Sequence, residues 1–152
     1  MERVLKLLIG LCLVSLFCAC DTMKSASYDA YAHKQTIAIK TSSEELIDKG
    51  VYSYESYETE VRALMNKIDS LMVYEQHKKH QKISLSMWKV LIDKDRNLLG
   101  GYLGRWKSKG KLPAVFVAEA KVQIMAAFDA LIAYEAQKDA RSKEGVLQLI
   151  LN

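Results

Sequence analysis

The chain has 152 residues, 50% of them hydrophobic, and carries 22 basic and 18 acidic side chains for a net charge of +4. This length allows one ordinary domain with its own core, and so mild a positive charge does not by itself indicate a nucleic-acid partner. Pro113 is the only proline, which argues against a loop-rich β-sandwich.

A secretion signal is indicated at the start of the chain. Arg3 and Lys6 precede an uncharged run over residues 7–20, LLIGLCLVSLFCAC, which ends at Asp21. A membrane-spanning helix needs about 20 apolar residues to cross the hydrocarbon, so this shorter run favours a signal peptide that is removed.

The end of the run, residues 16–20 (LFCAC), resembles the lipobox of bacterial lipoproteins. In that family a small residue precedes a cysteine that is acylated and becomes the new N-terminus. Ala19 and Cys20 match the pattern, whereas Phe17 stands where the family usually has leucine. The resemblance covers the first 20 residues and implies a signal peptide at 1–19 and lipidation of Cys20.

Lipidation would make residues 20–25 a tether between a membrane and a domain at residues 26–152. The resemblance implies a membrane-anchored lipoprotein of the cell envelope that faces the periplasm. Asp21, directly after Cys20, resembles the inner-membrane retention signal of enteric bacteria. The inner and the outer membrane both stay open as its location.

All three cysteines, Cys12, Cys18 and Cys20, lie in this first segment, so the mature chain would keep only Cys20 and could form no internal disulfide. Removal of residues 1–19 takes away two basic and one acidic side chain, which lowers the net charge to +3. The exported domain is therefore expected to depend on its own apolar core.

The first segment of the mature domain, residues 25–49, permits two interpretations. Residues 36–40 alternate like a strand, whose partner would be the apolar run at 146–151. We favour a helix, because a lone strand needs a partner and because helical spacing relates Tyr28, Tyr31, Ile39 and Leu46.

Two capping boxes lie inside this segment, Thr41 with Glu44 and Ser42 with Glu45. A capping box is typical of a helix N-terminus, so these pairs indicate that a helix can begin afresh there rather than run through. Gly50 is expected to end the helix.

The clearest helix lies over residues 54–72, where apolar side chains recur in alternating steps of three and four. They are Tyr54, Tyr57, Val61, Leu64, Ile68 and Leu71, widened by Met65 and Met72. A second stripe, interrupted by Asp95, comprises Trp88, Leu91, Leu98, Tyr102 and Trp106. A third helix is expected to begin at Pro113, a residue tolerated at the first helical position, and to continue through Phe116, Ala120, Ile124, Ala127, Phe128, Leu131 and Tyr134.

These elements predict an all-α fold: a small up-and-down bundle of about four helices after the signal peptide, with an apolar C-terminal tail. The tail, residues 146–152, is expected to fold back on the bundle or pair with residues 37–39, or else to dock into a partner protein. In an up-and-down bundle tethered at Cys20, the turn at 77–82 faces the membrane and the turn at 105–111 lies at the far end.

Both turns are basic, and both are candidate interaction surfaces. The first contains Lys78, Lys79 and Lys82, which would attract anionic headgroups by about 1 kcal/mol per lysine. The second would suit an acidic partner, a cell-wall polymer or nucleic acid, through Arg105, Trp106, Lys107, Lys109 and Lys111. Lysines in turns can equally serve solubility, and Trp106 also continues a core stripe.

Few residues indicate a metal or cofactor site. His77 and His80, with Glu75 nearby, are weak metal candidates, because zinc usually takes at least three protein ligands. Residues 93–97 superficially resemble a calcium loop but lack its glycine and its bidentate glutamate. We therefore expect no cofactor.

Catalytic motifs are not apparent either. Asp95 is expected on the inward face, bonded to a neighbour or capping a break. Gly100, Gly101 and Gly104 do not follow a strand, so they indicate a kink, a helix end or a close helix approach rather than a dinucleotide loop. No constellation of nucleophile and base lies after Cys20, so we expect no enzyme activity.

The expected function is that of a non-enzymatic envelope lipoprotein with a structural or protein-interaction role. Its partners would be the membrane, through the lipid, and an envelope protein, but not nucleic acid. A mobile-element exclusion or immunity protein falls within this class. The alternative is a periplasmic lipoprotein that captures a metal or a small ligand.

Overall fold

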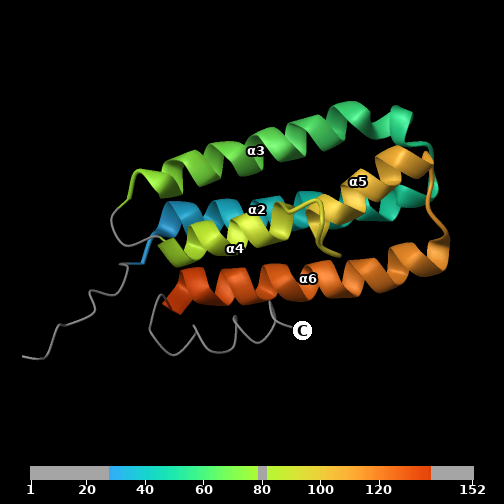
Figure 1. Ribbon diagram of the computed structural model, residues 1–152. Coiled ribbons are helices and arrows are strands. Elements are labelled where there is room, and N and C mark those ends of the chain that lie inside the picture. The colour runs from blue at the N-terminus through green and yellow to red at the C-terminus, as the bar shows by residue number, and fades with distance from the viewer. Residues whose placement is uncertain (1–27, 79–81, 138–152) are drawn as a thin grey trace, which may run out of the picture.

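The computed structural model describes residues 28–78 and 82–137, and these form an all-helical bundle, as predicted (Figure 1). The elements are α2 (Ala30–Ile47), the 3-10 turns η2 (Asp48–Val51) and η3 (Tyr54–Tyr57), α3 (Glu58–Gln76), α4 (Lys82–Ile92), α5 (Leu99–Lys109) and α6 (Ala114–Gln137). Within these ranges no helix is both long and apolar enough to cross a membrane.

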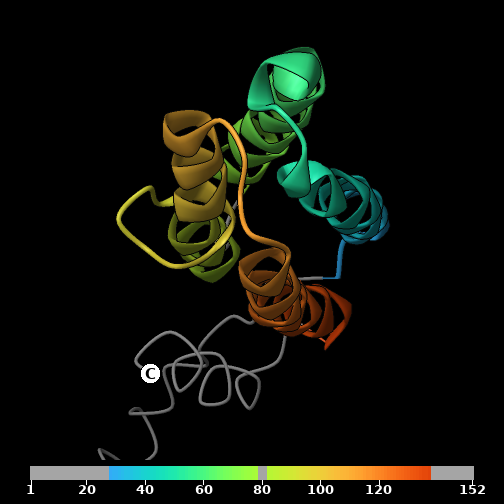
Figure 2. The same ribbon diagram turned by 90° about the vertical axis from the view of Figure 1, so that its right-hand side faces the viewer.

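The helices stand in four columns with alternating direction, the third column being formed by α4 and then α5 (Figures 1 and 2). The expected up-and-down order is therefore confirmed, with one difference. The second stripe belongs to two helices rather than one, because the chain leaves the helix over residues 93–98. Stripe residues on either side of this break still reach the common core.

Asp29 is the N-cap of helix α2, and its Oδ1 accepts hydrogen bonds from the backbone N–H groups of Tyr31 (2.9 Å) and Ala32 (3.1 Å). Residues 36–40 lie inside this helix, so the strand alternative for them is wrong. The restart at the capping boxes is wrong as well: the helix runs through, and the Thr41 hydroxyl donates to the Ile37 carbonyl. The helix ends at Ile47, and Gly50 lies in the 3-10 turn that follows.

One buried and mostly apolar stripe on α2 explains why the helix is continuous. Side chains buried against α3 and α6 recur along its whole length and outweigh the local capping signals, since tertiary burial overrides such preferences. The buried residues are Ala32, Thr36, Ile39, Ser43, Leu46 and Ile47.

The predicted stripes on the other helices form the core. On α3 and η3 the predicted residues are buried, with three at the margin only partly so: Tyr57, Met65 and Met72. Trp88, Trp106 and Phe128 are fully buried, and the Trp88 and Phe128 rings meet edge to face at 6.1 Å between centroids. Aromatic side chains therefore supply much of the apolar area that holds the four columns together.

The two ends of the bundle are fixed by different elements. At the N-terminal end, where α2 begins and α3 ends, the Tyr74 hydroxyl donates to Asp29 Oδ2 at 3.0 Å. At the opposite, distal end, the Tyr54 N–H donates to the Gly110 carbonyl at 2.7 Å and the Leu112 N–H donates to the Gly50 carbonyl at 2.8 Å. The segments predicted as signal peptide, tether and apolar tail lie outside the described residues.

Candidate binding cleft

The break between α4 and α5 borders a concave feature of the described chain. Asp93 Oδ1 accepts the Asp95 N–H at 3.0 Å, which turns the chain out of the helix. The loop then folds back so closely that a Cβ at Gly100 would collide with the Ile92 carbonyl, and one at Gly101 with the Arg96 carbonyl. The predicted close approach at these two glycines is confirmed: Gly100 lies against the last residue of α4, and Gly101 lies against the loop.

The structure differs from the sequence prediction at two residues of this region, Asp95 and Gly104. Asp95 is exposed rather than inward, because the helical spacing that placed it on the core face is broken at this point. A Cβ at Gly104 would meet nothing within 4 Å, so close packing does not require glycine there.

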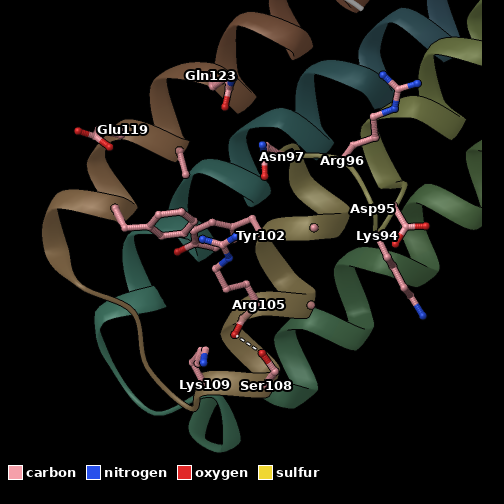
Figure 3. Close-up of a pocket in the computed structure, with 14 residues that line it drawn as sticks. Lys94, Asp95, Arg96, Asn97, Tyr102, Arg105, Ser108, Lys109, Glu119 and Gln123 are labelled. Carbon is pink, nitrogen blue, oxygen red and sulfur yellow. Dashed lines mark hydrogen bonds between the residues drawn. The ribbon is translucent and has the colours of Figure 1, made fainter.

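Between this loop, α5 and α6 lies a cleft of about 660 Å³ (Figure 3). Its lining carries four basic and two acidic side chains: Lys94, Arg96, Arg105 and Lys109 against Asp95 and Glu119. No ion pair joins Lys94, Arg105 or Lys109 to a carboxylate of the described chain. The cleft therefore carries a positive charge that favours anionic groups.

An aromatic pair forms one wall of the cleft. Tyr102 and Phe116 lie with their rings parallel, 6.2 Å apart, and the Arg105 guanidinium lies 4.8 Å from the Phe116 centroid. The Tyr102 hydroxyl donates to the Ile47 carbonyl at 2.7 Å. Burial, and then the negative charge of Asp48, raise the pKa of this phenol, so Tyr102 is a neutral structural donor at physiological pH.

The structure separates the predicted distal candidates. Arg105 and Lys109 line the cleft, whereas Lys107 lies beside Glu58, 3.6 Å from its carboxylate. Lys111 is exposed on the segment between α5 and α6. The prediction that Trp106 is a surface interaction residue is wrong, because its side chain is 0% exposed and its Nε1–H donates to the Tyr52 carbonyl at 2.9 Å.

Of the N-terminal lysine candidates, the structure describes Lys78 and Lys82. Lys78 forms an ion pair with Asp29 and lies 4.5 Å from the Tyr74 ring centroid, so its charge is partly compensated. Lys82 is exposed at the start of α4. Lys79 lies outside the described residues.

The histidine candidates are not brought together in the described part of the chain. His77 Nδ1 donates to the Val73 carbonyl at 2.8 Å, and His80 lies outside the described ranges. Residues 28–78 and 82–137 contain no group of three or more metal-ligating side chains.

Two carboxylates are buried in the core, which the sequence did not predict. Glu75 on α3 and Glu135 on α6 are 1% and 0% exposed, and Glu135 Oε1 accepts a hydrogen bond from the Ser84 hydroxyl on α4. Burial, then the negative charges of Glu135 and Glu75, raise the pKa of the Tyr134 phenol. Helical spacing was the available signal, since each glutamate lies four residues after a core leucine.

The described chain thus has a basic cleft in its distal half and a polar, tyrosine-containing N-terminal end. No protein-family model, curated protein or solved structure matches the chain. The chemistry of these two regions is therefore the basis for a function.

Proposed function

We propose that the protein is a lipid-anchored, non-enzymatic adaptor of the bacterial cell envelope, which binds an acidic segment of a partner protein in the basic cleft. The relative position of the two regions carries this proposal. Acyl chains on Cys20 would hold the N-terminal end near a membrane. The cleft lies in the other half of the bundle, so it would open toward the periplasm.

The composition of the cleft supports an acidic protein segment as the ligand. Arginine binds carboxylates through paired hydrogen bonds, and Arg105 is already oriented by its contact with Phe116. Ser108, on the same wall, uses its hydroxyl to donate to the Arg105 carbonyl at 3.0 Å (Figure 3). The cleft is an open surface feature, which suits a side chain from a partner better than a deeply enclosed substrate.

A photo-crosslinking residue at Ser108, introduced in intact cells, tests this proposal. We expect a discrete crosslinked partner that is lost when Arg105→Glu and Lys109→Glu reverse the charge of the cleft. Lys67→Glu, at an exposed position on α3 away from the cleft, is the matched control and should leave the crosslink intact. Crosslinking that survives reversal of the cleft charge would contradict the proposed surface.

Capture of a small anionic ligand is the second candidate function, and the size of the cleft favours it. Its volume of about 660 Å³ falls in the range of small-molecule sites. Isothermal titration with dicarboxylates and inorganic phosphate distinguishes the two candidates. Saturable heat that Arg105→Glu removes would support ligand capture, whereas no heat together with a charge-dependent crosslink would support the adaptor.

A further inference from the structure

Three exposed tyrosines gather at the N-terminal end of the bundle. Tyr28, Tyr31 and Tyr74 are 55%, 53% and 37% exposed, whereas the core tyrosines Tyr54, Tyr102 and Tyr134 are no more than 8% exposed. Tyr52, at the distal end, is also exposed, at 56%, but in the described chain it has no second exposed tyrosine from another α-helix beside it. We call the first three the tyrosine patch. Tyr31 and Tyr74 meet edge to face with 4.7 Å between their ring centroids, so the patch bridges α2 and α3.

Polar contacts hold the patch in place. The Tyr74 hydroxyl donates to Asp29, Lys78 lies over the Tyr74 ring, and Lys78 also pairs with Asp29. The Tyr28 hydroxyl lies 3.2 Å from His33 Nδ1. The rings are thus oriented although they are exposed, and exposed rings held in one orientation present a defined amphipathic surface.

The position of the patch along the bundle is equally specific. Tyr31 lies in the first turn of α2, and Tyr74 lies two residues before the end of α3. A helix rises about 1.5 Å per residue, so both rings start within about 3 Å of the ends of their helices. Both tyrosines therefore lie close to the N-terminal end face of the bundle.

We infer that the tyrosine patch lies in the headgroup region of the bilayer that holds the acyl chains of Cys20. Tyrosine is enriched where membrane meets water, because its ring is apolar and its hydroxyl is hydrated. The eight residues from Cys20 to Tyr28 span at most about 29 Å, which lets the patch reach that bilayer. The inference rests on the lipid anchor of the proposed function.

The lysine attraction expected from the sequence stays a separate prediction, which differs from the tyrosine patch in its dependence on charge. Lys78 is compensated by Asp29, so the described part of the N-terminal end has less free positive charge than the sequence suggested. Partition of tyrosine rings depends little on the charge of the lipid, whereas lysine attraction falls with salt. The orientation of the bundle on the membrane is therefore expected to persist on neutral lipids.

Tryptophan fluorescence of the lipidated protein tests the inference in phosphatidylcholine vesicles whose headgroups carry a nitroxide quencher. Trp88 and Trp106 are 0% exposed and give a constant background. Tyr31→Trp places a probe in the patch, and Val115→Trp, at a position 71% exposed near the distal end, is the matched control. We expect the nitroxide to reduce the added emission at position 31 and to leave that at position 115 unchanged.

Iodide in the aqueous phase provides the complementary measurement. It should quench the emission of a tryptophan at position 115 more strongly than that of a tryptophan at position 31. Equal quenching of both positions by iodide, without quenching by the nitroxide, would overturn the inference and leave the patch open to a protein partner. Tyr28→Trp is a second probe if Tyr31→Trp fails to fold.

Flotation of the vesicles before the measurement separates the two proposals. Protein that does not float lacks the anchor, which overturns the proposed function and the patch together. Protein that floats with an unquenched position 31 overturns the patch only.

Discussion

The two ends of the bundle connect neighbouring helices by different chemistry. At the distal end, the ring centroid of Trp106 lies 5.4 to 6.4 Å from those of Tyr54, Tyr57 and Tyr102. Backbone hydrogen bonds also join the turns at this end. At the N-terminal end, the contacts between α2 and α3 around Asp29 are ionic or involve exposed tyrosines. Burial of aromatic area stabilises far more than exposed ion pairs, so the distal contacts of Trp106 are expected to stabilise the bundle more than the contacts around Asp29.

The largest expected effect is the loss of the distal aromatic cluster. Trp106→Ala removes a fully buried ring and the donor to the Tyr52 carbonyl, and should lower the free energy of unfolding by about 3–5 kcal/mol. Tyr74→Ala, at the N-terminal end, should cost clearly less. Urea denaturation followed by circular dichroism measures both, and equal losses would contradict the difference between the ends.

A pair of glycine variants examines the distal packing more finely. A Cβ at Gly50 would collide with the Tyr102 hydroxyl, so Gly50→Ala should destabilise by about 1–3 kcal/mol. Gly104→Ala adds a Cβ with no neighbouring atom within 4 Å, and should stabilise α5 by up to about 1 kcal/mol. Adding Tyr102→Phe to Gly50→Ala should recover part of the loss in a double-mutant cycle. Strict additivity would show that the collision is relieved elsewhere.

A serine pair on α4 tests the buried carboxylate near the N-terminal end. Ser84→Ala removes the hydroxyl that donates to buried Glu135, and a loss of about 1–3 kcal/mol is expected on chemical denaturation. Ser86→Ala removes an exposed hydroxyl that donates to the Lys82 carbonyl, and should change stability by less than about 0.5 kcal/mol. Indistinguishable midpoints for the two variants would refute a structural role for the Ser84 contact.

Alkaline pH should weaken the distal end through Tyr102. Because burial raises the pKa of this phenol in the folded state, the unfolded phenol ionises first, at about pH 10. The contribution of Tyr102 to the free energy of unfolding is therefore fully present below that pH and falls as the pH rises above it. Tyr102→Phe should lose about 1 kcal/mol at neutral pH, with its hydrogen bond to Ile47, and should show a shallower alkaline decline. Parallel pH profiles would argue against this role.

The smallest effect is expected at an exposed connection between α6 and α2. Lys121 donates to the Asp48 carboxylate and lies 3.3 Å from Glu44, and these contacts raise the pKa of its amine despite some burial. Lys121→Gln should cost about 0.2–1 kcal/mol, because solvent and salt screen exposed pairs. The difference in free energy of unfolding between Lys121→Gln and the natural protein should become smaller in high salt. A salt-independent difference would point to packing by the lysine stem instead.

Much of the helical architecture followed from periodicity, because core positions on a helix repeat every three or four residues. The stripe from Tyr54 to Leu71 is the clearest case, and it is buried as expected. The break at residues 93–98 was harder to place, since Leu91, Leu98 and Tyr102 keep nearly helical spacing along it. The capping boxes in α2 misled because a local signal cannot reveal the tertiary packing that overrides it.

The cleft could be predicted only in part. Arg105 and Lys109 were among the distal candidates, yet Lys94 and Arg96 join them only because the loop folds back over Gly100 and Gly101. Trp106 belonged to both a basic turn and a core stripe, and burial decided between these assignments. The burial of Glu75 and Glu135 was not predicted, because a charged side chain is ordinarily assigned to the surface.

Mass analysis of the protein from membranes tests the lipid anchor, by comparing the natural chain with Cys20→Ser. We expect the natural protein to begin at residue 20, to carry acyl chains on that cysteine and to sediment with membranes. The serine variant should lack the acyl mass and the cleavage. A serine variant that sediments with membranes at the same mass as the natural protein would contradict the anchor, and with it the orientation of the bundle.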